Sequence, residues 1–276
     1  SARPVKFRFP LQSQDTLSII EYFYAICNVS GWFFKSRKRK YYLLHKFKRL
    51  ILYIFVHSYE KGMVVMATIA LFSGQGSQYE KMGLDLVQQD AALEEIFEVA
   101  SEVLGFDLYA VIADSDAQTL AHTIYAQPAI MATSLVCLEA AKKRGFTYDA
   151  VAGHSLGEYA AMVAAGMLSL EDGFKVIKAR SEAMDAAAKA ADGAMCAILK
   201  LAPAEVERIC SETEGYVIPA NYNSSVQTVI AGDRDAVEKA AAACAALKAR
   251  AVPLAVASAF HTKLMQPAAD TFYKAI

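Results

Sequence analysis

The stretch that decides the fold is AVAGHSLGE, which occupies residues 150–158. It opens with three apolar residues, and its serine, Ser155, stands near Gly153 and Gly157. An apolar run, a glycine-flanked serine and a run of helix formers predict a strand that turns sharply into a helix. The glycines omit the Cβ atoms that would clash in so tight a turn. The stretch therefore predicts an α/β fold with the Ser155 hydroxyl exposed at a strained corner.

A serine at such a corner is suited to act as a covalent nucleophile. The first amides of the following helix point at the turn and stabilise an oxyanion that forms there. The alternative is a serine in an ordinary glycine turn. The apolar run before Ser155 and the helix formers after it favour the nucleophile.

Short apolar runs and helical patterns alternate around this stretch. Residues 68–72 predict a strand that enters a glycine loop at residues 73–78. Helices are expected over residues 91–104, 127–141, 158–165 and 170–190. Pro128 is expected in the first turn of the second helix and Gly166 at the end of the third. The last pattern fits one long helix or two broken ones.

A different pattern follows Gly193. Strands are expected over residues 194–200, 217–220, 226–231 and 251–256, and helices over residues 203–212 and 233–247. The order β-α-β-β-α-β is that of a ferredoxin-like unit. Residues 193–256 therefore predict a ferredoxin-like subdomain inserted in a larger α/β body.

A serine hydroxyl is a poor nucleophile until a base takes its proton. His261 follows the last predicted strand, so base follows nucleophile as in α/β-hydrolase arrangements. Taken alone, a histidine after a strand is more often a hydrogen-bonded core or surface residue. His154 is expected to be structural, because neighbours in a sharp turn point apart. His261 is therefore the candidate base.

Five motifs, in this order, resemble the malonyl-CoA:acyl carrier protein transacylases, the acyltransferase family of fatty-acid and polyketide synthesis. They are GQGSQ at residues 74–78, GHSLGE at 153–158, ARS at 179–181, NYN at 221–223 followed by Gln227 and Gly232, and SAFH at 258–261 followed by Leu264 and Met265. Ser73 stands where the family usually has proline, and Ser181 where it usually has glycine. The resemblance covers residues 68–276. It implies an α/β-hydrolase-like catalytic body at residues 66–192 and 257–276 around the ferredoxin-like insert.

The resemblance also implies a two-step acyl transfer that needs no metal or redox cofactor. Ser155 attacks the thioester of malonyl-CoA with His261 as base, and the malonyl group then passes to the phosphopantetheine thiol of acyl carrier protein. The backbone N–H groups of Gln75 and Leu156 form the oxyanion hole. Arg180 binds the free malonyl carboxylate through two parallel hydrogen bonds, which an acetyl group cannot offer. The alternative for Arg180 is a surface arginine on a helix.

Two other functions are weighed against this one. A serine hydrolase, such as a thioesterase or lipase, shares the turn and the histidine. It needs an acidic residue to orient the base, and none stands in a convincing position at a strand end. The second alternative is an inactive fragment. The family continues past Ile276 with residues that close the pocket and orient the histidine, so we expect a C-terminally truncated chain.

Residues 1–65 differ in composition from the rest of the chain. They hold 12 Lys+Arg and 3 Asp+Glu, whereas the remainder holds 16 and 26. We interpret them as a basic, aromatic-rich leader outside the domain, translated in frame before Met66. The alternative is an arm for nucleic acid or a membrane surface, because residues 35–40 form a dense cationic cluster.

Cysteine usage and hydropathy indicate the cellular compartment of the protein. The 5 cysteines show neither CxxC pairs nor metal-ligand spacing, which predicts reduced thiols in a cytoplasmic protein. No apolar run reaches the ~18 residues that a membrane-spanning helix needs. We expect a cytoplasmic monomer whose partners are malonyl-CoA and acyl carrier protein, without nucleic acid or membrane.

Overall fold

The computed structural model describes residues 51–60 and 63–276, with side chains from Thr68 onward. The cationic cluster at residues 35–40 lies outside the described residues. Strand β1 (Ile51–Glu60) falls inside the segment that the sequence separates from the domain, and it pairs antiparallel with β2 (Met63–Phe72). A boundary at residue 65 stays a prediction.

The first sheet places two loops at one edge. Its order is β1-β2-β3, and β3 (Ala150–Gly153) pairs parallel to β2 with Phe72 opposite Gly153. The pairing continues one residue further, because the His154 N–H donates to the Phe72 carbonyl at 3.0 Å. Since parallel strands end at the same edge, the glycine loop after β2 meets the turn after β3 there.

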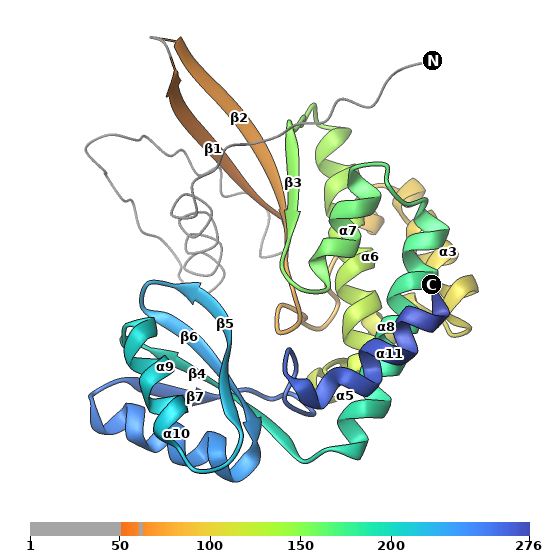
Figure 1. The fold of residues 1–276 in the computed structure, drawn as a ribbon. Coiled ribbons are helices and arrows are strands. Elements are labelled where there is room, and N and C mark those ends of the chain that lie inside the picture. Colours follow the sequence, from red (N-terminus) through yellow and green to blue (C-terminus); the bar gives the residue numbers. More distant parts are fainter. Residues whose placement is uncertain (1–50, 61–62) are drawn as a thin grey trace.

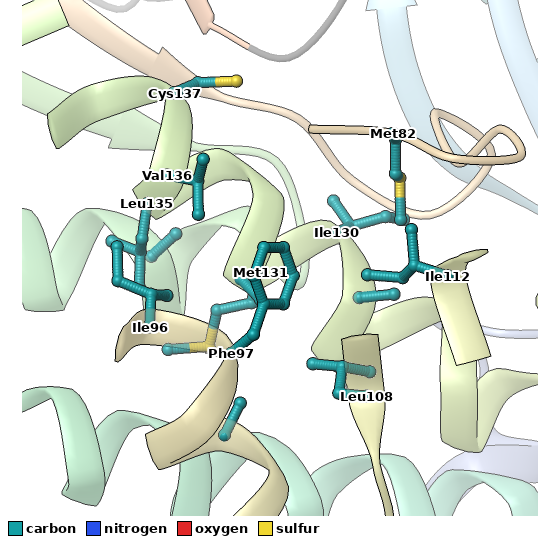
Figure 2. Close-up of a cluster of buried hydrophobic side chains, with 14 of the residues drawn as sticks. Met82, Ile96, Phe97, Leu108, Ile112, Ile130, Met131, Leu135, Val136 and Cys137 are labelled. Carbon is teal, nitrogen blue, oxygen red and sulfur yellow. The ribbon is translucent and has the colours of Figure 1, made fainter. Parts of the chain in front are cut away.

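The helices between β2 and β3 form the main core. They are α2 (Leu84–Gln89), the 3₁₀ turn η1 (Ala91–Leu93), α3 (Glu95–Leu104), α4 (Leu108–Asp114), α5 (Ala117–Leu120) and α6 (Thr123–Lys142). Figure 2 shows side chains of α3, α4 and α6, among them Phe97, Leu108 and Met131, pointing toward one another. The helix expected at residues 91–104 is split, because the Asp90 carboxylate accepts from the Ala92 N–H and caps the short turn first.

Helix α6 differs from its expected form at its start. It begins at Thr123, so Pro128 lies inside the helix and the expectation of a first-turn proline is wrong. Proline has no N–H, so the carbonyl of Ile124 receives no helical hydrogen bond from it. The helix is long and apolar enough to cross a membrane by length and composition, but 83% of its most apolar window is buried inside the fold. Such burial is that of a core helix.

Two helices follow β3. Helix α7 (Gly157–Ala164) ends just before Gly166, whose φ of +70° suits glycine, as expected. Helix α8 (Leu170–Ala190) is continuous, which decides between the two forms left open for this stretch. Its start is capped by Ser169, whose Oγ accepts from the Asp172 N–H at 3.0 Å. Helix α7 stands beside β3, and α8 packs against α6 and α7 on the side away from the sheet (Figure 1).

The second sheet is antiparallel, with order β5-β6-β4-β7. Its elements in chain order are β4 (Gly193–Leu199), α9 (Pro203–Glu212), β5 (Val217–Ser224), β6 (Gln227–Asp233), α10 (Arg234–Ala246) and β7 (Arg250–Pro253). The element order matches the expectation. Strand β5 is longer than expected and β7 is shorter, ending at Pro253.

The two faces of this sheet are buried against different partners. Cys196 and Ile198 of β4 pack with residues of α9 and α10. Met195 and Ala197, on the opposite face, join a cluster with the end of α8 and with Phe260. The chain then closes with the 3₁₀ turn η2 (Lys263–Met265) and α11 (Gln266–Ala275), which packs against α8 (Figure 1). The second sheet thus supports the segment that carries His261.

Candidate active site

Ser155 stands at the turn between β3 and α7. Its φ is +54°, a left-handed conformation that non-glycine residues rarely adopt. A Cβ on Gly153 would lie 2.1 Å from the carbonyl carbon of Gly157, and a Cβ on Gly157 would lie 2.3 Å from the Phe72 oxygen. Both glycines are therefore required for the close approach of β2, β3 and α7. The side chain of Ser155 is left at the corner, outside any regular element.

The imidazole of His261 lies beside this hydroxyl. Ser155 Oγ and His261 Nε2 are 3.1 Å apart, although 106 positions separate the two residues. His261 also has a left-handed backbone, with φ of +61°. The preceding Phe260 is buried in the cluster below the second sheet, which anchors the segment. Donation from the serine hydroxyl to Nε2 requires the ring proton on Nδ1.

Both histidines of the site have pKa values below the ordinary value. Although the residue keeps an exposed edge, the pKa of His261 is lowered from its ordinary value, mainly by loss of hydration around the ring and further by the nearby Arg180 cation. Burial, with a smaller effect from His261, lowers the pKa of His154 to about 4. The Nδ1 atom of His154 would lie 2.6 Å from a Cβ on Gly74, so this ring packs under the glycine loop. At neutral pH the Nε2 of His261 can therefore accept a proton.

Arg180 reaches the nucleophile from α8. Its Nη2 donates to Ser155 Oγ at 3.0 Å, and its Nη1 donates to Gln127 Oε1 at 2.6 Å. The guanidinium also lies 5.6 Å from the centre of the Tyr159 ring. Burial lowers the pKa of Arg180, but arginine remains cationic at neutral pH. A fixed positive charge thus stands beside the serine hydroxyl.

The glycine loop after β2 supplies backbone donors at the same edge. The Ser77 hydroxyl donates to the Gly74 carbonyl at 2.7 Å and bonds the buried Ser73 hydroxyl at 2.9 Å, which holds the loop closed. The N–H groups of Gln75 and Leu156 donate to no acceptor within residues 68–276. Two unused donors at this edge could receive an oxygen that becomes negatively charged.

No carboxylate of the described side chains lies within ion-pair distance of His261. The arrangement is therefore a serine–histidine pair with a cation, rather than a triad with an acidic residue. This agrees with the absence of a convincing acidic residue at a strand end in the sequence.

The structure brings together the predicted Ser155, His261 and Arg180, and adds two residues that sequence reasoning missed. Gln127 on α6 and Tyr159 on α7 both contact the guanidinium of Arg180. Gln127 carried one available signal, a polar residue in an otherwise apolar helical pattern. Tyr159 carried none beyond its position four residues after Ser155, on the same side of the helix that follows the turn.

The region after Gly193 contributes packing around the site. Asn223 is buried in β5, and a Cβ on Gly232 would lie 1.9 Å from the Tyr216 carbonyl oxygen. Gly232 therefore allows β5 and β6 to approach closely, which is a structural role. The motif around residues 221–232 was identified by resemblance, and its glycine has this physical reason.

Comparisons with known proteins agree with this geometry. The acyl transferase domain family matches residues 70–276. The malonyl CoA-acyl carrier protein transacylase of Bacillus subtilis is 42% identical over 210 residues, which cover 74% of this chain and 66% of that protein. The solved malonyl CoA-acyl carrier protein transacylase of Coxiella burnetii is 37% identical with a TM-score of 0.72, covering 75% of this chain and 67% of that one.

A further solved structure contains a partner. A type II PKS acyl-carrier protein in complex with its malonyl-transacylase is matched at 39% identity with a TM-score of 0.70, over 74% of this chain and 67% of that one. The chain spans 66% of the length of the Bacillus subtilis relative. The family match covers most of the chain and includes all five predicted site residues. The chain therefore belongs to the acyl transferase family.

Proposed function

We propose that the protein transfers a malonyl group from malonyl-CoA to the phosphopantetheine thiol of acyl carrier protein, through a malonyl ester of Ser155. The observation that carries this proposal is the half-buried guanidinium of Arg180, 3.0 Å from the nucleophilic oxygen. An uncharged acyl group has no use for a cation there, whereas a free carboxylate does. The names of the relatives from Bacillus subtilis and Coxiella burnetii support the same substrates.

In the first half-reaction, Ser155 Oγ attacks the thioester carbon of malonyl-CoA while its proton moves to Nε2 of His261. The tetrahedral intermediate collapses, the carbon–sulfur bond breaks, and the CoA thiolate takes the proton from the imidazolium. The products are free CoA and a malonyl ester of Ser155. The 3.1 Å separation of the two atoms suits this proton transfer.

In the second half-reaction, the thiol of the carrier protein gives its proton to His261 and attacks the ester carbon. Collapse breaks the ester bond, and the serine oxygen recovers a proton from the imidazolium. The backbone N–H groups of Gln75 and Leu156 would stabilise the oxyanion in both half-reactions. Their lack of another acceptor in the described chain supports this role.

Arg180 would select the acyl group. A guanidinium offers several N–H donors in one plane, so it can hold a carboxylate through two parallel bonds. The bond from Nη2 to Ser155 Oγ would be exchanged for bonds to the carboxylate when malonyl-CoA binds. The same cation adds to the loss of hydration in lowering the pKa of His261, which favours the unprotonated base.

We further infer an α/β-hydrolase-like body with a ferredoxin-like insert at residues 193–256. The strand order β5-β6-β4-β7, with α9 and α10 packed on one face, supports the insert. The parallel pairing of β2 with β3 around the turn at Ser155 supports the body. A cytoplasmic monomer remains our proposal for location and assembly, with all four described cysteines free.

Intact-mass spectrometry after mixing the chain with malonyl-CoA tests the function. We expect one malonyl group on Ser155, its absence from Ser155→Ala, and its loss when holo acyl carrier protein is added. CoA release at the same rate with and without carrier protein would instead indicate a hydrolase. A chain that accepts no malonyl group would contradict the proposal for residues 1–276 and favour an inactive fragment.

A further inference from the structure

Gln127 is a buried amide in the second turn of the apolar helix α6. Its exposed fraction is 0%, and its neighbours on α6 include the apolar Ala126, Ala129 and Ile130, which are buried as well. A polar side chain in such surroundings needs hydrogen-bond partners. The hydrogen bonds of its two polar atoms differ in length, and so in strength.

The strongest partner of the Gln127 side chain is Arg180. The Oε1 atom accepts from Arg180 Nη1 at 2.6 Å, whereas the Nε2 atom has only contacts at 3.5 Å with Gln75 Oε1 and at 3.4 Å with Met184 Sδ. The cation requires an oxygen facing it, which sets the orientation of the amide. Gln127 is thus held mainly by its bond to the guanidinium.

This bond also fixes where the guanidinium points. With Nη1 held by Gln127 from α6 and the ring of Tyr159 on α7 alongside, Nη2 is directed at Ser155 Oγ. The long arginine side chain has several rotatable bonds and would otherwise sample several rotamers. Each Nη atom carries two N–H groups, so Nη1 keeps one donor for a substrate oxygen while Gln127 holds the other.

A neutral acceptor suits this position better than a charged one. A carboxylate at the same place would pair with Arg180 and repel the free carboxylate of a substrate. An amide orients the cation but leaves its positive charge for the substrate. The choice between amide and carboxylate at position 127 therefore bears on which acyl group the site accepts.

We infer that Gln127 is a positioning residue that holds Arg180 over the nucleophile and thereby determines the preference for acyl groups that carry a carboxylate. This inference rests on the proposed function. It adds that selectivity depends on a third helix, α6, and not on Arg180 alone. The weak contact of Gln127 Nε2 with Gln75 further connects the cation to the glycine loop.

The test compares rates of Ser155 acylation by malonyl-CoA and by acetyl-CoA, measured by quenched intact-mass spectrometry. For Gln127→Glu we expect malonyl transfer to fall on the order of 100-fold while acetyl transfer changes by less than about threefold. For Gln127→Met, which keeps the size but loses the bond, we expect a smaller malonyl loss of about tenfold. The matched control is Gln88→Glu, an exposed glutamine on α2 with the same change of charge.

The outcomes separate the inference from the function. A wild-type chain that takes no malonyl group overturns the proposed function, and the inference falls with it. If the wild type is malonylated, the inference alone is overturned by unchanged malonyl rates in both variants. It is also overturned by equal losses for malonyl and acetyl transfer in variants whose thermal unfolding matches the wild type, because a merely structural role affects both donors alike.

Discussion

The turn that carries Ser155 and the segment that carries His261 reach the same point by different means. Ser155 is placed by nine consecutive residues, in which Gly153 and Gly157 allow a strand to turn directly into a helix. His261 is placed by packing, because Phe260 is buried with Met195 of β4 and Ala187 of α8. The nucleophile is therefore set by local sequence, and the base by contacts between distant parts of the chain.

The largest expected effect comes from the nucleophile itself. Ser155→Ala removes the atom that forms the acyl ester, so acylation by malonyl-CoA should fall by at least about 10³-fold. Intact mass and CoA release measure the loss, and Ser225→Ala, an exposed serine in the turn after β5, is the control. Full acylation of the Ser155→Ala chain would place the nucleophile elsewhere and remove the basis of the comparison.

The next effect tests whether residues of the turn itself place Ser155. Gly153→Ala would put a Cβ 2.1 Å from the carbonyl carbon of Gly157, within the same turn, so we expect a loss of about 4 kcal/mol in unfolding free energy or no folded protein. Gly105→Ala is the matched control. Gly105 has a left-handed φ of +83° with nothing within 4 Å of the added atom, so its cost should be about 1 kcal/mol. Chemical denaturation measures both, and equal losses would show that crowding at the turn is unimportant.

A third effect tests whether packing between distant parts of the chain places His261. Phe260→Ala opens a cavity below the second sheet, and we expect a loss of about 3 kcal/mol in unfolding free energy. Because the same change frees the His261 segment, acylation should also slow, at temperatures where the variant remains folded. Tyr273→Ala, an exposed aromatic residue on α11, serves as the control in denaturation and acylation assays. An unchanged acylation rate would show that His261 is held without this packing.

The smallest effect concerns the pH dependence of the base. The pKa of His261 lies below its ordinary value, so acetylation of Ser155 by acetyl-CoA should rise with pH only in the acidic range and stay constant near neutrality. Arg180→Met removes a cation that disfavours the imidazolium, so the rise should move to higher pH. The change in rate at a given acidic pH should be roughly a few-fold at most. Loss of hydration, and not Arg180, is the larger cause of the lowered pKa of His261. A pH–rate profile of both chains measures it, and a shift to lower pH would contradict this electrostatic effect.

Much of the framework followed from the sequence because its signals are local. The strand–turn–helix at residues 150–158, the end of α7 before Gly166 and the order of elements after Gly193 depend on short runs, glycines and periodicity. The start of α6 did not follow in this way. Thr123–Gln127 fits a helix only because it packs into the core, and Pro128 is tolerated inside it for the same reason. The pairing of β1 with β2 was also missed, although it is local, because Glu60 lies opposite Met63.

The residues of the candidate site also divide into those that local sequence predicts and those that only the folded chain brings together. Sequence by itself determined the nucleophile, since the strain at Ser155 comes from its own neighbours and can be read from adjacent glycines. Only the tertiary structure decided that Arg180 meets Ser155, that Gln127 and Tyr159 hold that arginine, and that the surroundings of His261 lower its pKa. Those contacts join three helices and a loop after the second sheet, and their energies depend on distance and burial in the folded chain, which neighbouring residues in the sequence do not encode.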